Sequence, residues 1–329
     1  SHVAGSGLMR HLEPLPATLP NAVELNLGPR VGNVLEPHTA DGTASSGFGH
    51  HEWPPSKLAA PEEAILHREL ELMANDCPVL CSDVERARYR DLLQRHEMVF
   101  RMELKGKPQS SQEVDFGIPA GTFVPSQPMR VVKNPEVRDR AQARVDQFLE
   151  NGIVAKGRVQ VMSNLVIIDE HKVDEQGKPF LKTRITINMS TVNGYMPDGV
   201  NNIRPPHEAF YKASGAVCFG GSDESDAFFQ LQLSEASKQF AGFWGPNGEP
   251  YHFNRMPPGA KIAPEALHKV KMDQYSSLPV DNFAWIFDDA LMWTRATADD
   301  PRGVEAMFQL LESFLAICEK AGTILKPSK

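Results

Sequence analysis

Apolar residues recur every three to four positions in several stretches of the chain, the spacing that places them on one face of an α-helix. One predicted helix begins at Pro61. Three others run from Ser82 to Arg95, from Pro135 to Asn151, and from Val304 to Ala321. Pro61 and Pro135 suit a first helical turn, because the N–H that proline lacks has no acceptor there. Ser82 and Asn134 can cap their helices, and Gly322 can end the last one.

Two short runs rich in branched residues, Leu165–Ile168 and Thr183–Ile187, have the composition of β-strands. The turn Gln176-Gly177-Lys178 lies between them, so the sequence predicts a β-hairpin. From about residue 99 onward, helical and strand patterns alternate, and no internal repeat is visible. The pattern therefore predicts an α+β fold.

The first part of the chain has a different composition. Residues 1–60 are rich in Pro, Gly, Ser and His, which predicts an extended, partly irregular linker, with short strands at most around Val23–Leu27 and Val31–Leu35. Residues 61–98 form a short helical segment between this linker and the mixed region. No leader peptide is visible, and no apolar run approaches the ~18 residues needed to cross a bilayer, so no membrane association is expected.

Three aspartates carry the candidate chemistry. Asp288-Asp289 lie between the apolar runs Phe283–Phe287 and Ala290–Trp293, which is the pattern of a β-hairpin with acids at its tip. Buried carboxylates are costly unless a positive group holds them. With Asp223 at the end of another strand, the three acids could hold two divalent ions, which would clamp a 3′-hydroxyl and a nucleoside triphosphate. The alternative is an ordinary loop, as expected for Asp299-Asp300, which has no apolar frame.

The net charge of −8 is unusual for a protein that binds nucleic acid. About −6 of it lies in residues 1–100, and about −2 in residues 101–329. Several carboxylates of the second part surround the candidate metal site, where bound cations would offset them: Asp223, Glu224, Asp226, Asp288 and Asp289. The basic residues lie mostly elsewhere, from Arg130 to Arg184, and give weak support for a surface that contacts phosphates. The four cysteines are too few for a disulfide framework, so a reducing compartment is expected.

Six segments resemble, in order and spacing, the motifs of reverse transcriptases of LTR retrotransposons (the gypsy-like class) and of retroviruses. They are Phe148–Val154, similar to Leu-Leu-x-x-Gly-Ile-Ile; Arg184–Asn193, similar to Arg-x-x-Val-Asp-Tyr-Arg-x-Leu-Asn; Asp223–Gln230, motif A; Met256–Pro264, motif B; Ile286–Asp289, the Tyr-x-Asp-Asp of motif C; and Ala321–Lys329, motif D. The resemblance covers roughly residues 83–329. Each motif alone is weak, but six in order are specific.

The resemblance implies a right-hand polymerase fold. Fingers, with the start of the palm, would occupy residues 99–214, and a palm with an antiparallel sheet and packed helices would occupy residues 215–329. The thumb, connection and RNase H parts of the family are absent from this sequence. The implied function is that of an RNA-directed DNA polymerase of a retroelement polyprotein. It would use two Mg²⁺ or Mn²⁺ ions to add dNTPs to a primer on an RNA or DNA template. The expected location is intracellular: the cytoplasm, a virus-like particle or the nucleus.

The resemblance also implies roles for individual residues. Asp223 and Asp288 would bind both ions, and Asp289 would support them. The implied nucleotide-binding residues are Arg184, Lys172, Asp226, Ala227, Phe228, Gly259 and Lys329. Arg184 and Lys172 would hold the triphosphate, and Phe228 would lie under the sugar as a barrier to a 2′-hydroxyl; the alternative is that Phe228 is a core aromatic. Gly259 would permit close backbone approach, and Lys329 would donate a proton to the leaving pyrophosphate.

Five positions depart from the family pattern. Pro258 and Ile262 replace an aromatic or polar residue and an asparagine in motif B, Ile286 replaces the tyrosine of motif C, and Asn188 and Ser190 replace an aspartate and an arginine in the fingers. All three acids survive. The sequence thus leaves two hypotheses: an active polymerase, or a co-opted, catalytically silent relative that serves as a structural or interaction subunit of a larger assembly, with protein partners.

Overall fold

The computed structural model describes residues 9–10, 60–101, 113–173, 177–199 and 205–327. Apart from the short strand β1 (Met9–Arg10), the predicted linker and its candidate strands at 23–27 and 31–35 lie outside the described residues. None of the described helices is long and apolar enough to cross a membrane.

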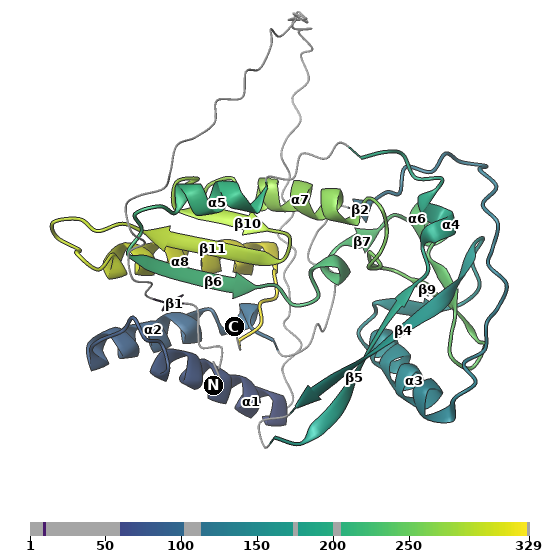
Figure 1. Ribbon diagram of the computed structural model, residues 1–329, viewed down its shortest axis with the longest axis horizontal. Coiled ribbons are helices and arrows are strands. Elements are labelled where there is room, and N and C mark those ends of the chain that lie inside the picture. The colour runs from purple at the N-terminus through teal and green to yellow at the C-terminus, as the bar shows by residue number, and fades with distance from the viewer. Residues whose placement is uncertain (1–8, 11–59, 102–112, 174–176, 200–204, 328–329) are drawn as a thin grey trace, which may run out of the picture.

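A four-stranded antiparallel sheet forms one half of the molecule (Figure 1). Its order is β1-β6-β11-β10, with β6 at Cys218–Asp223, β11 at Asp289–Thr294 and β10 at Phe283–Ile286. This sheet has the antiparallel pairing that was predicted for residues 215–329.

Three long helices complete this half. Helix α8 (Val304–Ala321) packs against the sheet, and α1 (Ala60–Asn75) and α2 (Asp83–Arg95) share its apolar core. The predicted start of α2 is confirmed: Ser82 and Glu85 form a reciprocal capping box. The predicted end of α8 is also confirmed, since Gly322 adopts φ +67°, a conformation that glycine takes without the steric cost of a Cβ.

The second half contains a five-stranded sheet of order β3-β9-β8-β4-β5. Its strands are β3 (Val154–Lys156), β9 (Pro250–Phe253), β8 (Gly242–Trp244), β4 (Met162–Val173) and β5 (Pro179–Ile187). The predicted hairpin is confirmed, because β4 and β5 pair antiparallel from Leu165↔Ile187 to Val173↔Pro179. Helix α3 (Pro135–Glu150), capped by Asn134 as predicted, packs against this sheet (Figure 1).

The remaining described helices and strands lie outside the two larger sheets. They are η1 (Glu97–Val99), β2 (Glu113–Val114), α4 (Ser190–Asn193), α5 (Pro206–Lys212), η2 (Ala227–Gln230), β7 (Gln232–Leu233), α6 (Glu235–Lys238) and α7 (Ala263–Gln274). The described apolar residues form two cores, one in each half. Cys218 at the start of β6 lies in the first core, whereas Phe229 and Leu231 lie in the second. Asp223 therefore stands where the chain passes from one core to the other.

Candidate active site

The turn between β10 and β11 lies beside the end of β6. Ile286 pairs with Asp289, so Phe287 and Asp288 form a two-residue turn, and Asp289 pairs in turn with Asp223. The Glu224 N–H donates to the Asp288 carbonyl oxygen at 2.9 Å. The hairpin predicted from the apolar-Asp-Asp-apolar pattern is confirmed. Its turn is strained, because Phe287 has φ +58°, a region that bulky side chains rarely adopt.

The three aspartates differ in their surroundings. Asp288 and Asp289 are exposed, whereas Asp223 is 2% exposed. The Lys326 ammonium lies 2.8 Å from Asp223 Oδ2, and the Lys326 N–H donates to the Asp223 carbonyl oxygen at 3.0 Å. Within the described ranges, no three His, Cys, Asp or Glu side chains are grouped so as to hold a metal ion. The predicted site for two ions stays a prediction.

The donor set nevertheless suits hard divalent cations. Mg²⁺ and Mn²⁺ prefer carboxylate oxygens, which all three residues offer. Asp223 and Asp289 are direct cross-strand partners, so their side chains project from the same face of the sheet. A cationic group, the Lys326 ammonium, already lies at Asp223. The chemistry of these donors therefore fits the ions that the sequence resemblance implies, although the three carboxylates are not grouped as a metal site among the described residues.

Lys326 was not among the predicted site residues. Sequence reasoning chose Lys329, which lies outside the described residues. Lys326 is fixed through its neighbour Leu325, whose N–H donates to the Val99 carbonyl at 2.7 Å and whose carbonyl accepts from Arg101 N–H at 3.2 Å. The signal available in the sequence was a second lysine in the same short C-terminal motif.

A buried polar network lies directly behind Asp223. The Glu224 carboxylate is 2.7 Å from Lys271 Nζ of α7, and both side chains are less than 5% exposed. Tyr275 donates its hydroxyl to Glu224 Oε1 at 2.9 Å, and burial raises the pKa of that hydroxyl well above its usual value. Burial also raises the pKa of the neighbouring Cys318 thiol to about 12. Glu224 was expected to be offset by bound metal ions, but its partner is Lys271.

The residues after Asp223 adopt a tight helical turn. Asp226 is exposed with φ +47°, and Ala227 is buried. Phe228 is half-buried and packs against the second core. Both interpretations of Phe228, a sugar-contacting barrier and a core aromatic, therefore stay open.

The motif B segment is tied to the second half of the molecule. Thr186 of β5 donates its hydroxyl to the Pro258 carbonyl at 2.6 Å, and Asn193 Nδ2 donates to the Gly259 carbonyl at 2.9 Å. Gly259 has φ +94°, and a Cβ built there meets no atom closer than the Ile187 carbonyl oxygen at 4.0 Å. Backbone conformation, and not crowding, is thus the reason for glycine at this position.

The predicted phosphate-binding cations already have carboxylate partners. Arg184 Nε lies 3.0 Å from Glu170 Oε1, and Lys172 Nζ lies 3.7 Å from Glu170 Oε2. Lys172 and Glu170 lie on β4, and Arg184 lies on β5. The idea that Arg184 reaches toward the aspartates across an open cleft stays a prediction.

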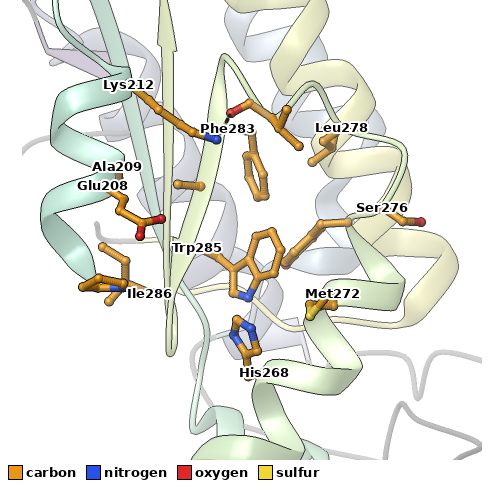
Figure 2. A pocket seen from close by; sticks show the side chains of 14 residues that line it. Glu208, Ala209, Lys212, His268, Met272, Ser276, Leu278, Phe283, Trp285 and Ile286 are labelled. Atoms are coloured by element: carbon orange, nitrogen blue, oxygen red, sulfur yellow. Dashed lines mark hydrogen bonds between the residues drawn. The ribbon is translucent and has the colours of Figure 1, made fainter. Parts of the chain in front are cut away.

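A cavity of about 210 Å³ lies between α5, α7 and β10 (Figure 2). Phe283 and Trp285 of β10 line it, and the His268 ring of α7 stacks on Trp285 with centroids 5.7 Å apart. Ile286, the residue that precedes the strained turn, also lines it. Sequence reasoning missed this cavity, because α5 lies more than fifty positions before the other segment that lines it, residues 268–286.

Comparison with known proteins identifies the fold. No protein-family model matches the chain. It is 23% identical over 154 residues to the retrovirus-related Pol polyprotein from transposon 412 of Drosophila melanogaster, a match that spans 12% of that polyprotein. It is similar in structure to the protease-reverse transcriptase of prototype foamy virus, with a TM-score of 0.65, 16% identity, and coverage of 80% of this chain and 33% of that one. The foamy viral enzyme in complex with an RNA/DNA hybrid gives a TM-score of 0.62, 17% identity, and coverage of 81% and 33%.

These similarities show the fold. The chain has the α+β fold of a reverse transcriptase, as the motifs predicted, and spans about a third of the length of these two solved structures.

Proposed function

We propose that the chain is the fingers and palm portion of an RNA-directed DNA polymerase from a retroelement polyprotein. The observation that carries the proposal is the pairing of Asp223 with Asp289 beside the Asp288 turn, at one end of an antiparallel sheet in a fold of the reverse transcriptase type. Acids that the sequence separates by more than sixty positions meet at this end. That juxtaposition is what two-metal nucleotidyl transfer requires.

In this proposal Asp223 and Asp288 are the metal ligands and Asp289 supports them. Two bound Mg²⁺ or Mn²⁺ ions would supply the Lewis acidity that activates the primer 3′-hydroxyl and offsets the triphosphate charge. Arg184 and Lys172 hold the triphosphate through charge-assisted hydrogen bonds. The nucleotide site is completed by Asp226, Ala227, Phe228 and Gly259, with Lys329 as proton donor to the leaving group.

The proposed partners are a template–primer of RNA or DNA and dNTPs. Foamy viral neighbours in complex with double-stranded DNA and with an RNA/DNA hybrid support this choice of ligand. An intracellular location, in the cytoplasm, a virus-like particle or the nucleus, belongs to the same proposal.

Single-nucleotide addition to a primed RNA template tests the proposal. We expect the chain with Mn²⁺ or Mg²⁺ to add nucleotides with little processivity, and Asp288→Asn to lower the rate at least about 100-fold, because a metal ligand is lost. Asp299→Asn is the matched control, since Asp299 is exposed and the substitution changes the net charge equally. Addition that persists in Asp288→Asn would refute the assignment.

A catalytically silent subunit is the second candidate. The observation that favours it is that the predicted metal-binding and phosphate-binding groups already pair with oppositely charged side chains. Lys326 pairs with Asp223, and Glu170 pairs with Arg184 and Lys172. Such pairs neutralise groups that an active polymerase would present to metal and phosphate. Complete absence of nucleotide addition, together with a folded chain, would favour this function.

A further inference from the structure

The contact between Lys326 and Asp223 is built by the main chain as well as the side chains. Leu325 forms bridges with both Phe100 and Glu224, so the segment that carries Lys326 is held between two parts of the first half of the molecule. The Ser225 N–H donates to the Ile324 carbonyl at 2.8 Å and strengthens this attachment. The ammonium group therefore meets Asp223 Oδ2 from a fixed backbone position.

We propose that Lys326 is a positioning residue whose ammonium holds the Asp223 carboxylate in the metal-free protein, and that a divalent ion binds by displacing it. This inference rests on the proposed function, because it takes Asp223 as a metal ligand. Lys326 thereby sets the affinity of the site for its ions. Lys326 would then influence nucleotide addition through the bound ion, without contacting the substrate.

Charge and burial together support the displacement. Asp223 is 2% exposed, and a carboxylate so far removed from water needs a positive neighbour. An ion at ~2.1 Å from the same oxygen would lie within about 5 Å of an unmoved ammonium at 2.8 Å, which is strongly repulsive. The Lys326 side chain is 39% exposed and has a flexible four-carbon stem, so it can turn into solvent when the ion arrives.

The affinity of the whole 329-residue chain for Mn²⁺, measured by calorimetry, tests the inference. We expect Lys326→Met to bind Mn²⁺ about fivefold more tightly, because no cation must be displaced. Lys156→Met is the control: it removes one positive charge from an exposed pair with Glu249, and its affinity should equal that of the original chain. Both variants shift the net charge equally, so the difference between them reports the local contact.

Thermal unfolding supplies a second measurement. In EDTA, Lys326→Met should melt below the original chain, since Asp223 loses a counterion. At saturating Mn²⁺ the two melting temperatures should converge, because the ion takes the same place. Lys326→Gln, which keeps a hydrogen-bond donor but no charge, should also bind Mn²⁺ more tightly and covers the case in which the methionine variant fails to fold.

The outcomes separate this inference from the proposed function. Unchanged or weaker Mn²⁺ binding in both Lys326 variants, with binding to the original chain abolished by Asp223→Asn, would overturn the role of Lys326 alone. Absence of Mn²⁺ binding that depends on Asp223 in every form of the chain would overturn both.

Discussion

At the scale of single residues, the sequence predicts the acids of the candidate site, and it does not predict the lysines that pair with Asp223 and Glu224. Asp288 and Asp289 were chosen because two carboxylates inside an apolar run would be costly to bury, yet both are exposed at the hairpin turn and only Asp223 is buried. Lys326 and Lys271 reach Asp223 and Glu224 through contacts between residues that are about 50 to 100 positions apart in the chain. No local pattern encodes such contacts, so sequence reasoning attributed the neutralising charge to metal ions alone.

The buried pair Glu224–Lys271 yields a prediction about stability. Lys271→Met should lower the free energy of unfolding by ~3–5 kcal/mol, because it leaves the Glu224 carboxylate buried without its cation. The double replacement of Lys271 by Met and Glu224 by Leu should recover most of this loss. Chemical denaturation of each variant measures both effects.

Lys269→Met provides the matched control for this pair, since Lys269 is exposed on the same helix and its replacement should change stability by less than ~0.5 kcal/mol. A small effect of Lys271→Met would mean that Glu224 is neutralised in another way.

At the scale of elements, long helices with local signals were predictable and short elements were not. The bounds of α2 and α8 agree with the prediction because capping residues and a closing glycine lie next to each helix in the sequence. By contrast, α5 and η2 have at most seven residues and owe their conformation to neighbours in space. The cavity beside β10 was missed because α5 is distant in the chain from the other residues that line it.

Ion pairs between α2 and α8 predict a pH dependence of stability. The Arg88 guanidinium donates to Glu305 Oε1 at 3.0 Å, and this hydrogen bond lowers the pKa of Glu305 below its ordinary value of 4.5. A lowered carboxyl pKa contributes stability that is present above about pH 4.5 and is lost as the pH falls through the folded-state pKa.

The variant Arg88→Met should therefore melt about 1–3 °C below the original chain at pH 7, and the difference should shrink as the pH falls from 4.5 toward 3. Thermal unfolding followed by circular dichroism at each pH measures it. The control Arg138→Met removes a partly exposed guanidinium that approaches Asp139 only at 3.8 Å. A difference that grows toward acidic pH would contradict the pairing.

At the scale of the whole molecule, the sequence predicts the fold class, but it does not predict the contacts between the two halves. The order and spacing of six motifs sufficed to predict an α+β reverse transcriptase fold. The boundary between fingers and palm stays a prediction, and packing complicates it: Phe229 follows the motif A acid by six residues yet lies in the second core. Motif B is likewise bonded to β5 through Thr186. Such coupling depends on tertiary packing, which sequence patterns do not record.

The net charge of −8 opposes the binding of a triphosphate, and the β4–β5 hairpin carries the two cations that are proposed to hold it. Arg184 and Lys172 share Glu170, so the cations proposed to hold the triphosphate are partly neutralised before it arrives. Arg184→Ala should raise the dissociation constant of a dNTP on bound template–primer about tenfold, because charged hydrogen bonds to phosphate are lost. Glu170→Gln should act in the opposite direction and lower that constant about threefold at low salt, since both cations are released.

Glu249→Gln is the matched control for Glu170→Gln, because it changes the net charge equally and releases Lys156, which pairs with Glu249 at 3.6 Å. Lys156 lies on β3, at the edge of the five-stranded sheet opposite to β5. If both glutamine variants strengthen dNTP binding to the same extent, the gain comes from the general field of the protein and the hairpin has no special role. If only Glu170→Gln does so, and the gain fades at high salt as screening requires, the β4–β5 hairpin is the part of the molecule that holds the triphosphate.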